Sequence, residues 1–169
     1  MIAAKIHNYG NILRRYIRDY GDCQEVDDAV RVLDANKRYA LHAEDKTKLM
    51  GFEGIASNAY FEVLPKLILN QKESFPFNGR NRRPPKDAVN AMLSLAYTLI
   101  ANDCAAALET VGLDPYVGFL HALRPGRTSL ALDMTEEFRA YLGDRFVLSL
   151  INKRQVSPKD FLHQGDNGV

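Results

Sequence analysis

Hydrophobic residues recur at every third or fourth position along most of the chain, which is the spacing of helices that bury one face. The first such run predicts a helix over residues 2–20, with Gly21 as its stop signal. The same spacing predicts helices over residues 26–43 and 49–64, and Pro65 interrupts the second of these. The first half of the chain is therefore expected to form three amphipathic helices.

A proline- and glycine-containing segment, residues 71–86, predicts a loop, and it carries five cations against the single acid Glu73. Asp87 then caps a long apolar helix that ends near Gly112. After a turn and a Pro-Gly break, two further helices are expected over residues 130–141 and 143–152. Because no run with the period of a strand is long enough to anchor a sheet, we expect a mainly α fold, a helical bundle that forms one domain over residues 1–169.

The composition narrows the class of protein without identifying it. Of the 169 residues, 46% are hydrophobic and 25% are charged, and the formal net charge is +1, so a nucleic-acid surface would need local clustering of cations. The two cysteines, Cys23 and Cys104, match no zinc spacing and are expected to be reduced thiols in a cytoplasmic protein. We expect no signal peptide and no membrane span, because no uninterrupted apolar stretch approaches the required length.

Common signatures for nucleotide binding, serine hydrolysis and zinc peptidases are absent from the sequence, so acids and histidines are the candidates for chemistry. Glu53 lies in an apolar run between Gly51 and Gly54, where a backbone or a ligand could approach closely. A carboxylate in that position needs a partner. The spacing alone leaves a second interpretation open, in which Glu53 is paired with an arginine on a solvated helix face.

A second group of candidates lies towards the carboxyl end. His121 ends the apolar stretch PYVGFLH, and Asp133 and Glu136 are three residues apart on one helix face, with Glu137 also near Asp133. Together with Glu53 these groups form an oxygen-rich set with one imidazole, which suits Mg²⁺ or Mn²⁺. Taken singly, His121 is interpreted more readily as a hydrogen-bonded structural histidine than as a metal ligand.

Arginines near these acids could hold phosphates, and a divalent ion could activate an attacking oxygen at phosphorus. The same arginines could also belong to solvated basic loops. The candidates for DNA contacts are Arg80, Arg82, Arg83, Arg124 and Arg127.

Four blocks in a fixed order resemble the helical catalytic domain of the CRISPR-associated adaptation integrase, the larger of the two universal spacer-acquisition proteins. They are EGIASNAYF from Glu53, FNGRNRRPPKDAVNAMLSLAYTL from Phe77, GLDPYVGFLH from Gly112 and RPGRTSLALDMTEEFR from Arg124. The motifs RRPP, GFLH and LALD..EEFR are most similar to those of the branch found in type I systems, and within it to subtype I-C. Four ordered blocks are far more specific than any one of them.

The resemblance implies roles for individual residues. Glu53, His121 and Glu136 match the family's metal ligands, for Mg²⁺ or Mn²⁺. Asp133 matches the neighbouring acid that supports the catalytic site, and Arg124 matches a basic position that contacts DNA. The family's amino-terminal β-rich domain is missing from these residues, so we expect an excised domain, a split gene product or a remnant.

The resemblance also implies a reaction and partners. In the family, the 3' hydroxyl of a prespacer DNA attacks a phosphodiester at the repeat array, and water in its place gives cleavage, including cleavage of branched DNA. The full-length family protein is expected to form a homodimer and to act with a small adaptation partner protein, away from membranes. Two alternatives remain: a helical DNA-binding or interaction fragment without activity, and an unrelated bundle with coincidental acids.

Overall fold

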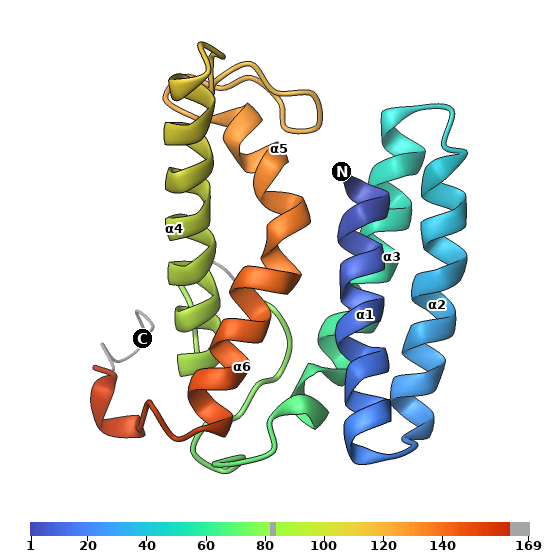
Figure 1. Ribbon diagram of the computed structural model, residues 1–169, viewed down its shortest axis with the longest axis vertical. Helices are drawn as coiled ribbons and strands as arrows, with labels where there is room; N and C mark the ends of the chain where they lie inside the picture. Colours follow the sequence, from blue (N-terminus) through green and yellow to red (C-terminus); the bar gives the residue numbers. More distant parts are fainter. Residues whose placement is uncertain (82–83, 163–169) are drawn as a thin grey trace.

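The computed structural model describes residues 1–81 and 84–162, and these form helices with no β-strand (Figure 1). The predicted mainly α class is therefore confirmed. The elements, in chain order, are α1 (Ile2–Tyr20), α2 (Gln24–Leu41), α3 (Lys46–Val63), η1 (Leu64–Leu67), α4 (Ala88–Thr110), α5 (Ser129–Phe138), η2 (Arg139–Asp144), α6 (Arg145–Asn152) and η3 (Pro158–Asp160).

The helices form two groups that meet along α1. Helices α1, α2 and α3 pack side by side, and α4, α5 and α6 form the second group (Figure 1). Helix α1 contacts α5 and η2 as well as α2 and α3, so its buried face lies between the two groups. On that face the rings of Tyr9 and Tyr60 stack with their centroids 3.9 Å apart. Any polar residue on the same face of α1 must find its partner between the groups.

Several helix ends follow the sequence signals. The Asp87 carboxylate accepts a hydrogen bond from the Asn90 backbone N–H at 2.8 Å, as expected for the cap of α4. Asp45 caps α3 in the same way through the Lys48 N–H, at 2.8 Å; this cap was not predicted, and α3 begins at Lys46 rather than at residue 49. Gly21 ends α1 with a φ of 90°, a conformation that a glycine adopts without steric cost. These local signals place α1, α3 and α4 close to their predicted bounds.

The connection between α5 and α6 differs from the prediction of two separate helices. Arg139–Asp144 instead forms a π-helix that runs from α5 into α6 without a break. A Cβ atom on Gly143 would lie 2.8 Å from the Tyr97 ring, so a glycine permits the close approach of this segment to α4. Within this segment Asp144 is fully buried and the Arg139 side chain is 11% exposed, and single π turns inside α-helices are frequent at functional sites.

The segment over residues 71–86 is a loop in its described part, as predicted, but it is anchored rather than merely solvated. Phe75 and Phe77 are buried in the core. The Asn90 side chain donates to the Gly79 carbonyl at 2.9 Å and accepts from the Asn81 backbone N–H at 3.0 Å. The loop is thus fixed against the start of α4.

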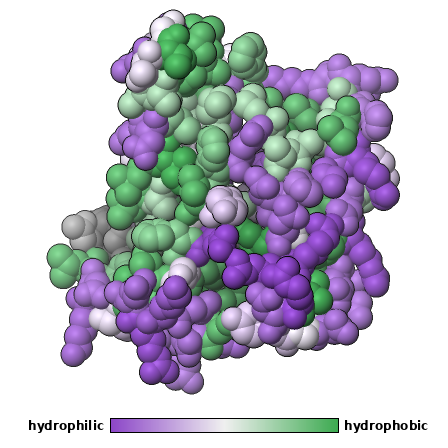
Figure 2. All heavy atoms as spheres, viewed as in Figure 1, coloured by the Kyte–Doolittle hydropathy of each residue, from purple (hydrophilic) through white to green (hydrophobic). Residues whose placement is uncertain are grey.

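Helix α4 corrects one expectation from the sequence. Among the described residues it is the one helix long and apolar enough to cross a membrane by length and composition, so the prediction that no segment approaches such a span was wrong for α4. Core helices of soluble proteins meet the same criterion when they are mostly buried; α4 packs against α5, η2 and α6, but only 28% of its apolar window is buried. Apolar residues gather on the α4 side of the face shown in Figure 2, whereas the side of α1 and α2 is mainly hydrophilic.

Asp144 gives the fold a pH dependence that can be measured. Its carboxyl is fully buried, and burial raises its pKa from 3.8 to about 6, although Tyr97, Tyr60, Lys5 and Arg139 all oppose that rise. Between pH 4 and 6 the folded state binds more protons than the unfolded state, so stability should fall as the pH rises and stay lower above pH 6. The shift in pKa corresponds to a loss of about 3 kcal/mol in the free energy of unfolding above pH 6.

The variant Asp144→Asn is neutral at every pH and keeps an oxygen for the Tyr97 hydroxyl. Its free energy of unfolding should therefore exceed that of the wild type at pH 7.5 by up to about 3 kcal/mol, with much of this gain gone at pH 4.5. Urea unfolding at the two pH values measures the difference. A difference that is the same at both values would contradict the raised pKa.

Candidate active site

Two of the predicted metal ligands meet at one buried lysine between the helix groups. The Lys5 ammonium on α1 is 2.6 Å from Glu136 Oε2 on α5 and is also hydrogen-bonded to Glu53 Oε1 on α3. The exposed fractions of the three side chains are 3% for Lys5, 16% for Glu53 and 6% for Glu136. We call Glu53 and Glu136 the carboxylate pair. It joins helices whose residues are far apart in the sequence.

The surroundings of Glu53 exclude one of its two interpretations. Its carboxylate accepts from the Ser57 hydroxyl at 2.8 Å as well as from Lys5, and it is not a solvated group paired with an arginine. Burial alone would raise the pKa of Glu53, but the Lys5 ammonium, together with the Ser57 hydroxyl and the charge of Arg139, outweighs burial and lowers that pKa. Glu53 is therefore held as a carboxylate that faces the interior.

Glu136 has a second cation in reach. Arg139 Nη1 is 3.0 Å from Glu136 Oε1, one helical turn further along the chain. The guanidinium of Arg139 also lies 5.0 Å from the centre of the Tyr97 ring. Glu136 Oε2 is buried, and among the described residues its one partner is the Lys5 ammonium. The two oxygens of Glu136 thus face two different cations.

Asp133 holds the loop that carries His121. Its fully buried carboxylate accepts from three successive backbone N–H groups: Phe119 at 2.5 Å, Leu120 at 2.8 Å and His121 at 2.9 Å. The Nδ1 atom of His121 lies 2.6 Å from Asp133 Oδ1. Burial favours the neutral acid, but these hydrogen bonds outweigh it and lower the pKa of Asp133. Asp133 therefore orients His121, and Nε2 is the ring nitrogen that does not face it.

The close contact between this loop and α5 depends on Gly118. A Cβ atom there would lie 2.7 Å from the Ser129 carbonyl carbon and 2.8 Å from Asp133 Oδ2. The glycine lets the backbone approach α5 closely enough for the next three N–H groups to reach Asp133.

The chemistry of these donors fits a divalent cation, although they are not gathered as a ligand cluster. Two carboxylates converge on one cation, and a histidine whose other nitrogen faces a carboxylate is the usual arrangement of a metal ligand. Over residues 1–81 and 84–162, however, no three acidic, histidine or cysteine side chains lie close enough together to hold a metal ion. The structure brings Glu53 and Glu136 together and leaves His121 beside Asp133.

The predicted DNA-contacting arginines have different surroundings. Arg80 donates to Asn90 Oδ1 at 2.8 Å and to Ser94 Oγ at 3.1 Å, so it ties the loop to α4. Arg124 is exposed and Arg127 is half-buried in the turn after His121. Arg82 and Arg83 lie outside the described residues.

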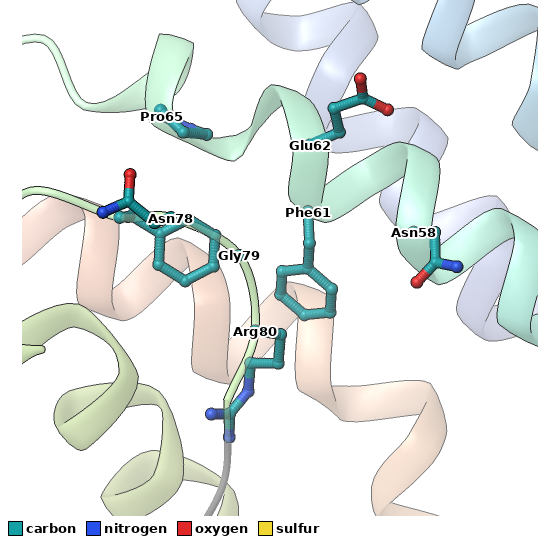
Figure 3. A pocket seen from close by; sticks show the side chains of 8 residues that line it. Asn58, Phe61, Glu62, Pro65, Asn78, Gly79 and Arg80 are labelled. Atoms are coloured by element: carbon teal, nitrogen blue, oxygen red, sulfur yellow. The ribbon is translucent and has the colours of Figure 1, made fainter. Parts of the chain in front are cut away.

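A cavity of about 380 Å³ lies between the end of α3 and the loop before α4 (Figure 3). Phe61 points towards the part of the loop that carries Asn78 to Arg80, and Asn58 and Glu62 line the α3 side. The carboxylate pair and His121 do not line this cavity. It is therefore a feature separate from the candidate active site.

Lys5 and Arg139 belong to the candidate active site but were missed from the sequence. Lys5 is three residues after Ile2 and four before Tyr9, so it lies on the apolar stripe of α1, where a charge requires a buried partner. Arg139 is three residues after Glu136 and shares its helix face. The position of Lys5 on an apolar stripe and that of Arg139 on the face of Glu136 can both be found from the sequence.

Comparison with known proteins decides the family. The family model described as CRISPR associated protein Cas1 matches residues 1–169. The chain belongs to the Cas1 family. The resemblance that the four sequence blocks indicated is thus confirmed, whereas the type I and I-C assignments stay predictions.

One Cas1 relative, from Leptospira interrogans serogroup Icterohaemorrhagiae serovar Lai, is named CRISPR-associated endonuclease Cas1. It is 43% identical over 167 residues, which are 97% of this chain and 65% of that protein. Four curated Cas1 relatives are spanned by the chain over 48% to 65% of their length. The chain thus corresponds to only part of each of these proteins.

Two solved structures share the fold. A partial Cas6-RT-Cas1–Cas2 complex matches with a TM-score of 0.85 and 28% identity, over 98% of this chain and 48% of that one. A casposase bound to integration product matches with a TM-score of 0.77 and 28% identity, over 99% of this chain and 45% of that one. The helical fold of the Cas1 family is therefore found in an assembly with Cas2 and in a protein bound to an integration product.

Proposed function

We propose that this chain carries the active site of a metal-dependent DNA endonuclease and integrase of CRISPR adaptation, which inserts prespacer DNA into the repeat array. The observation that carries the proposal is the convergence of Glu53 from α3 and Glu136 from α5 on one buried cation. The neighbouring pair of Asp133 and His121 supports it, since an imidazole oriented by a carboxylate is suited to binding a metal. Membership of the Cas1 family supports CRISPR adaptation as the process in which this site acts.

Glu53, Glu136 and Nε2 of His121 would hold Mg²⁺ or Mn²⁺, and Asp133 would orient the imidazole. When bound, the metal ion would stabilise the negative charge that develops around the phosphorus. In the reaction, the 3' hydroxyl of the prespacer forms a new P–O bond while the P–O bond to the leaving 3' oxygen breaks. The attacking hydroxyl loses its proton and the leaving oxygen gains one. Water as the attacking group gives cleavage instead.

DNA would be held by the cations around the site. Arg124 is exposed in the turn after His121, and Arg127 follows it. Both can contact phosphates, together with Arg82 and Arg83 from the loop before α4. Arg80 donates hydrogen bonds to Asn90 and Ser94 on α4, so we propose that it stabilises this loop.

The relatives support two of the proposed partners, DNA and Cas2. The solved Cas1–Cas2 complex supports a small adaptation partner, and the casposase on its integration product supports branched DNA as a substrate. A homodimer like that expected for the full-length family protein, and a location in the cytoplasm away from membranes, complete the proposal.

Cleavage of a labelled, branched DNA by the 169-residue chain, with and without Mn²⁺, tests the proposal. The wild type should cut only with metal. Glu53→Gln removes a charged ligand while retaining size, so the rate should fall at least about 100-fold, more than the loss of an outer-shell partner usually causes. The matched control is Glu62→Gln, which changes an exposed acid on the same helix and should cut at the wild-type rate.

The rival function is a helical DNA-binding or interaction fragment without activity. A folded wild-type chain that binds the branched DNA and does not cut it with Mn²⁺ would favour this rival. Equal rates for Glu53→Gln and the wild type would remove Glu53 from the active site.

A further inference from the structure

Lys5 occupies the one position that both members of the carboxylate pair face. Its ammonium is within hydrogen-bonding reach of Glu53 Oε1 and Glu136 Oε2 at once, and the side chain is almost completely buried. With Arg139 on the other oxygen of Glu136, two carboxylates are balanced by two cations. The charges of this buried cluster are therefore balanced without any metal.

A divalent cation cannot simply be added to this arrangement. Carboxylate oxygens lie about 2.0–2.1 Å from Mg²⁺, so a metal ion of this kind bound by Glu53 and Glu136 would lie almost where the ammonium now is. A metal ion and the Lys5 ammonium in nearly the same place in a buried site would repel each other strongly. The lysine has a flexible four-carbon stem, so its ammonium can move away while α1 remains in place.

We infer that Lys5 is a tethered cation that competes with the metal: it holds Glu53 and Glu136 together in the metal-free protein and leaves them when a divalent ion binds. The inference rests on the proposed metal site and adds a positioning residue to it. Lys5 keeps the two acids converged across α3 and α5 before the metal arrives. The same contact lowers the affinity for the metal, because binding must displace the ammonium.

Binding of Mn²⁺ to Lys5→Met measures this competition without reference to catalysis. Methionine keeps the length of the side chain and removes its charge, so the affinity for Mn²⁺ should rise at least about tenfold in the variant. Free Mn²⁺ is counted by electron paramagnetic resonance during a titration. Lys66→Met is the matched control, because Lys66 pairs with Glu25 at the surface, and its affinity should equal that of the wild type.

A purely structural lysine would give a different result. Loss of such a residue would leave the Mn²⁺ affinity unchanged or reduce it, because the carboxylate pair would become less well ordered. A folded Lys5→Met protein with that behaviour overturns the inference.

A second measurement on the wild type avoids any dependence on the folding of the variant. Acetylation of lysines, located by mass spectrometry, should leave buried Lys5 protected without metal and make it reactive at saturating Mn²⁺. Exposed Lys66 should react equally under both conditions. Protection of Lys5 that persists when Mn²⁺ is bound also overturns the inference.

The outcomes separate this inference from the proposed function. If the wild type binds Mn²⁺ and Lys5→Met binds it no more tightly, the competition fails while the metal site stands. If neither protein binds Mn²⁺, the metal site itself fails and the inference fails with it. Tighter binding by Lys5→Met, lost again in the double variant with Glu136→Gln, supports both.

Discussion

Asp133→Asn should destabilise the protein by about 2 to 5 kcal/mol, because it leaves buried N–H donors facing an amide NH₂. The donors at stake belong to Phe119, Leu120 and His121, and each oxygen of the carboxylate serves two donor atoms. Whichever way the new amide turns, its NH₂ group therefore meets donors instead of accepting from them. Urea unfolding followed by circular dichroism measures the loss of stability.

The same variant should lose metal-dependent cleavage, since the loop that carries His121 is fixed to α5 through Asp133. Asp103→Asn, an exposed aspartate on α4, is the control and should retain both stability and activity. An Asp133→Asn protein as stable as the wild type would show that the N–H groups find other acceptors.

The fold could be read from the sequence wherever a local rule decides it. Helical spacing with the cap at Asp87 and the stop at Gly21 places the helices within a few residues of their observed bounds. The π-helix was missed because its formation depends on tertiary fit: Gly143 lies against Tyr97, a residue 46 positions away in the chain. A glycine in a helical pattern favours a break in the helix. No local signal shows that the Tyr97 ring packs against Gly143, where a larger residue would not fit.

The candidate site could be predicted only in part, because its contacts join residues that are far apart in the sequence. Spacing alone put Asp133, Glu136 and Glu137 together, and the family resemblance selected Glu136. In the structure Glu136 faces Lys5, whereas Glu137 pairs with the amino terminus at 3.1 Å. Lys5 lies 48 residues from Glu53. The sequence shows that Lys5 lies on a buried face but does not show which helix packs against that face.

His121→Ala should abolish metal-dependent cleavage while leaving the fold intact. The side chain of His121 is 21% exposed, and the backbone N–H that binds Asp133 remains in alanine, so the variant loses one hydrogen bond to a charged group and about 1.5 kcal/mol of stability. The rate with Mn²⁺ should fall at least about 100-fold, since a lost ligand costs more than a lost outer-shell partner. The affinity for Mn²⁺ should fall as well, and the titration described for Lys5→Met measures it.

The control is His7→Ala, because His7 is exposed on α1 and its Nε2 atom lies 3.2 Å from the Asn11 side-chain amide, away from the carboxylate pair. A His121→Ala protein that cuts DNA at the wild-type rate with Mn²⁺ would make His121 a structural histidine and remove it from the ligand set. Comparison with Asp133→Asn then separates two roles. If Asp133 acts only by orienting His121, the two variants lose activity alike, and Asp133→Asn loses more stability than His121→Ala. If activity survives in His121→Ala but not in Asp133→Asn, the loop itself, rather than the imidazole, is what the active site requires.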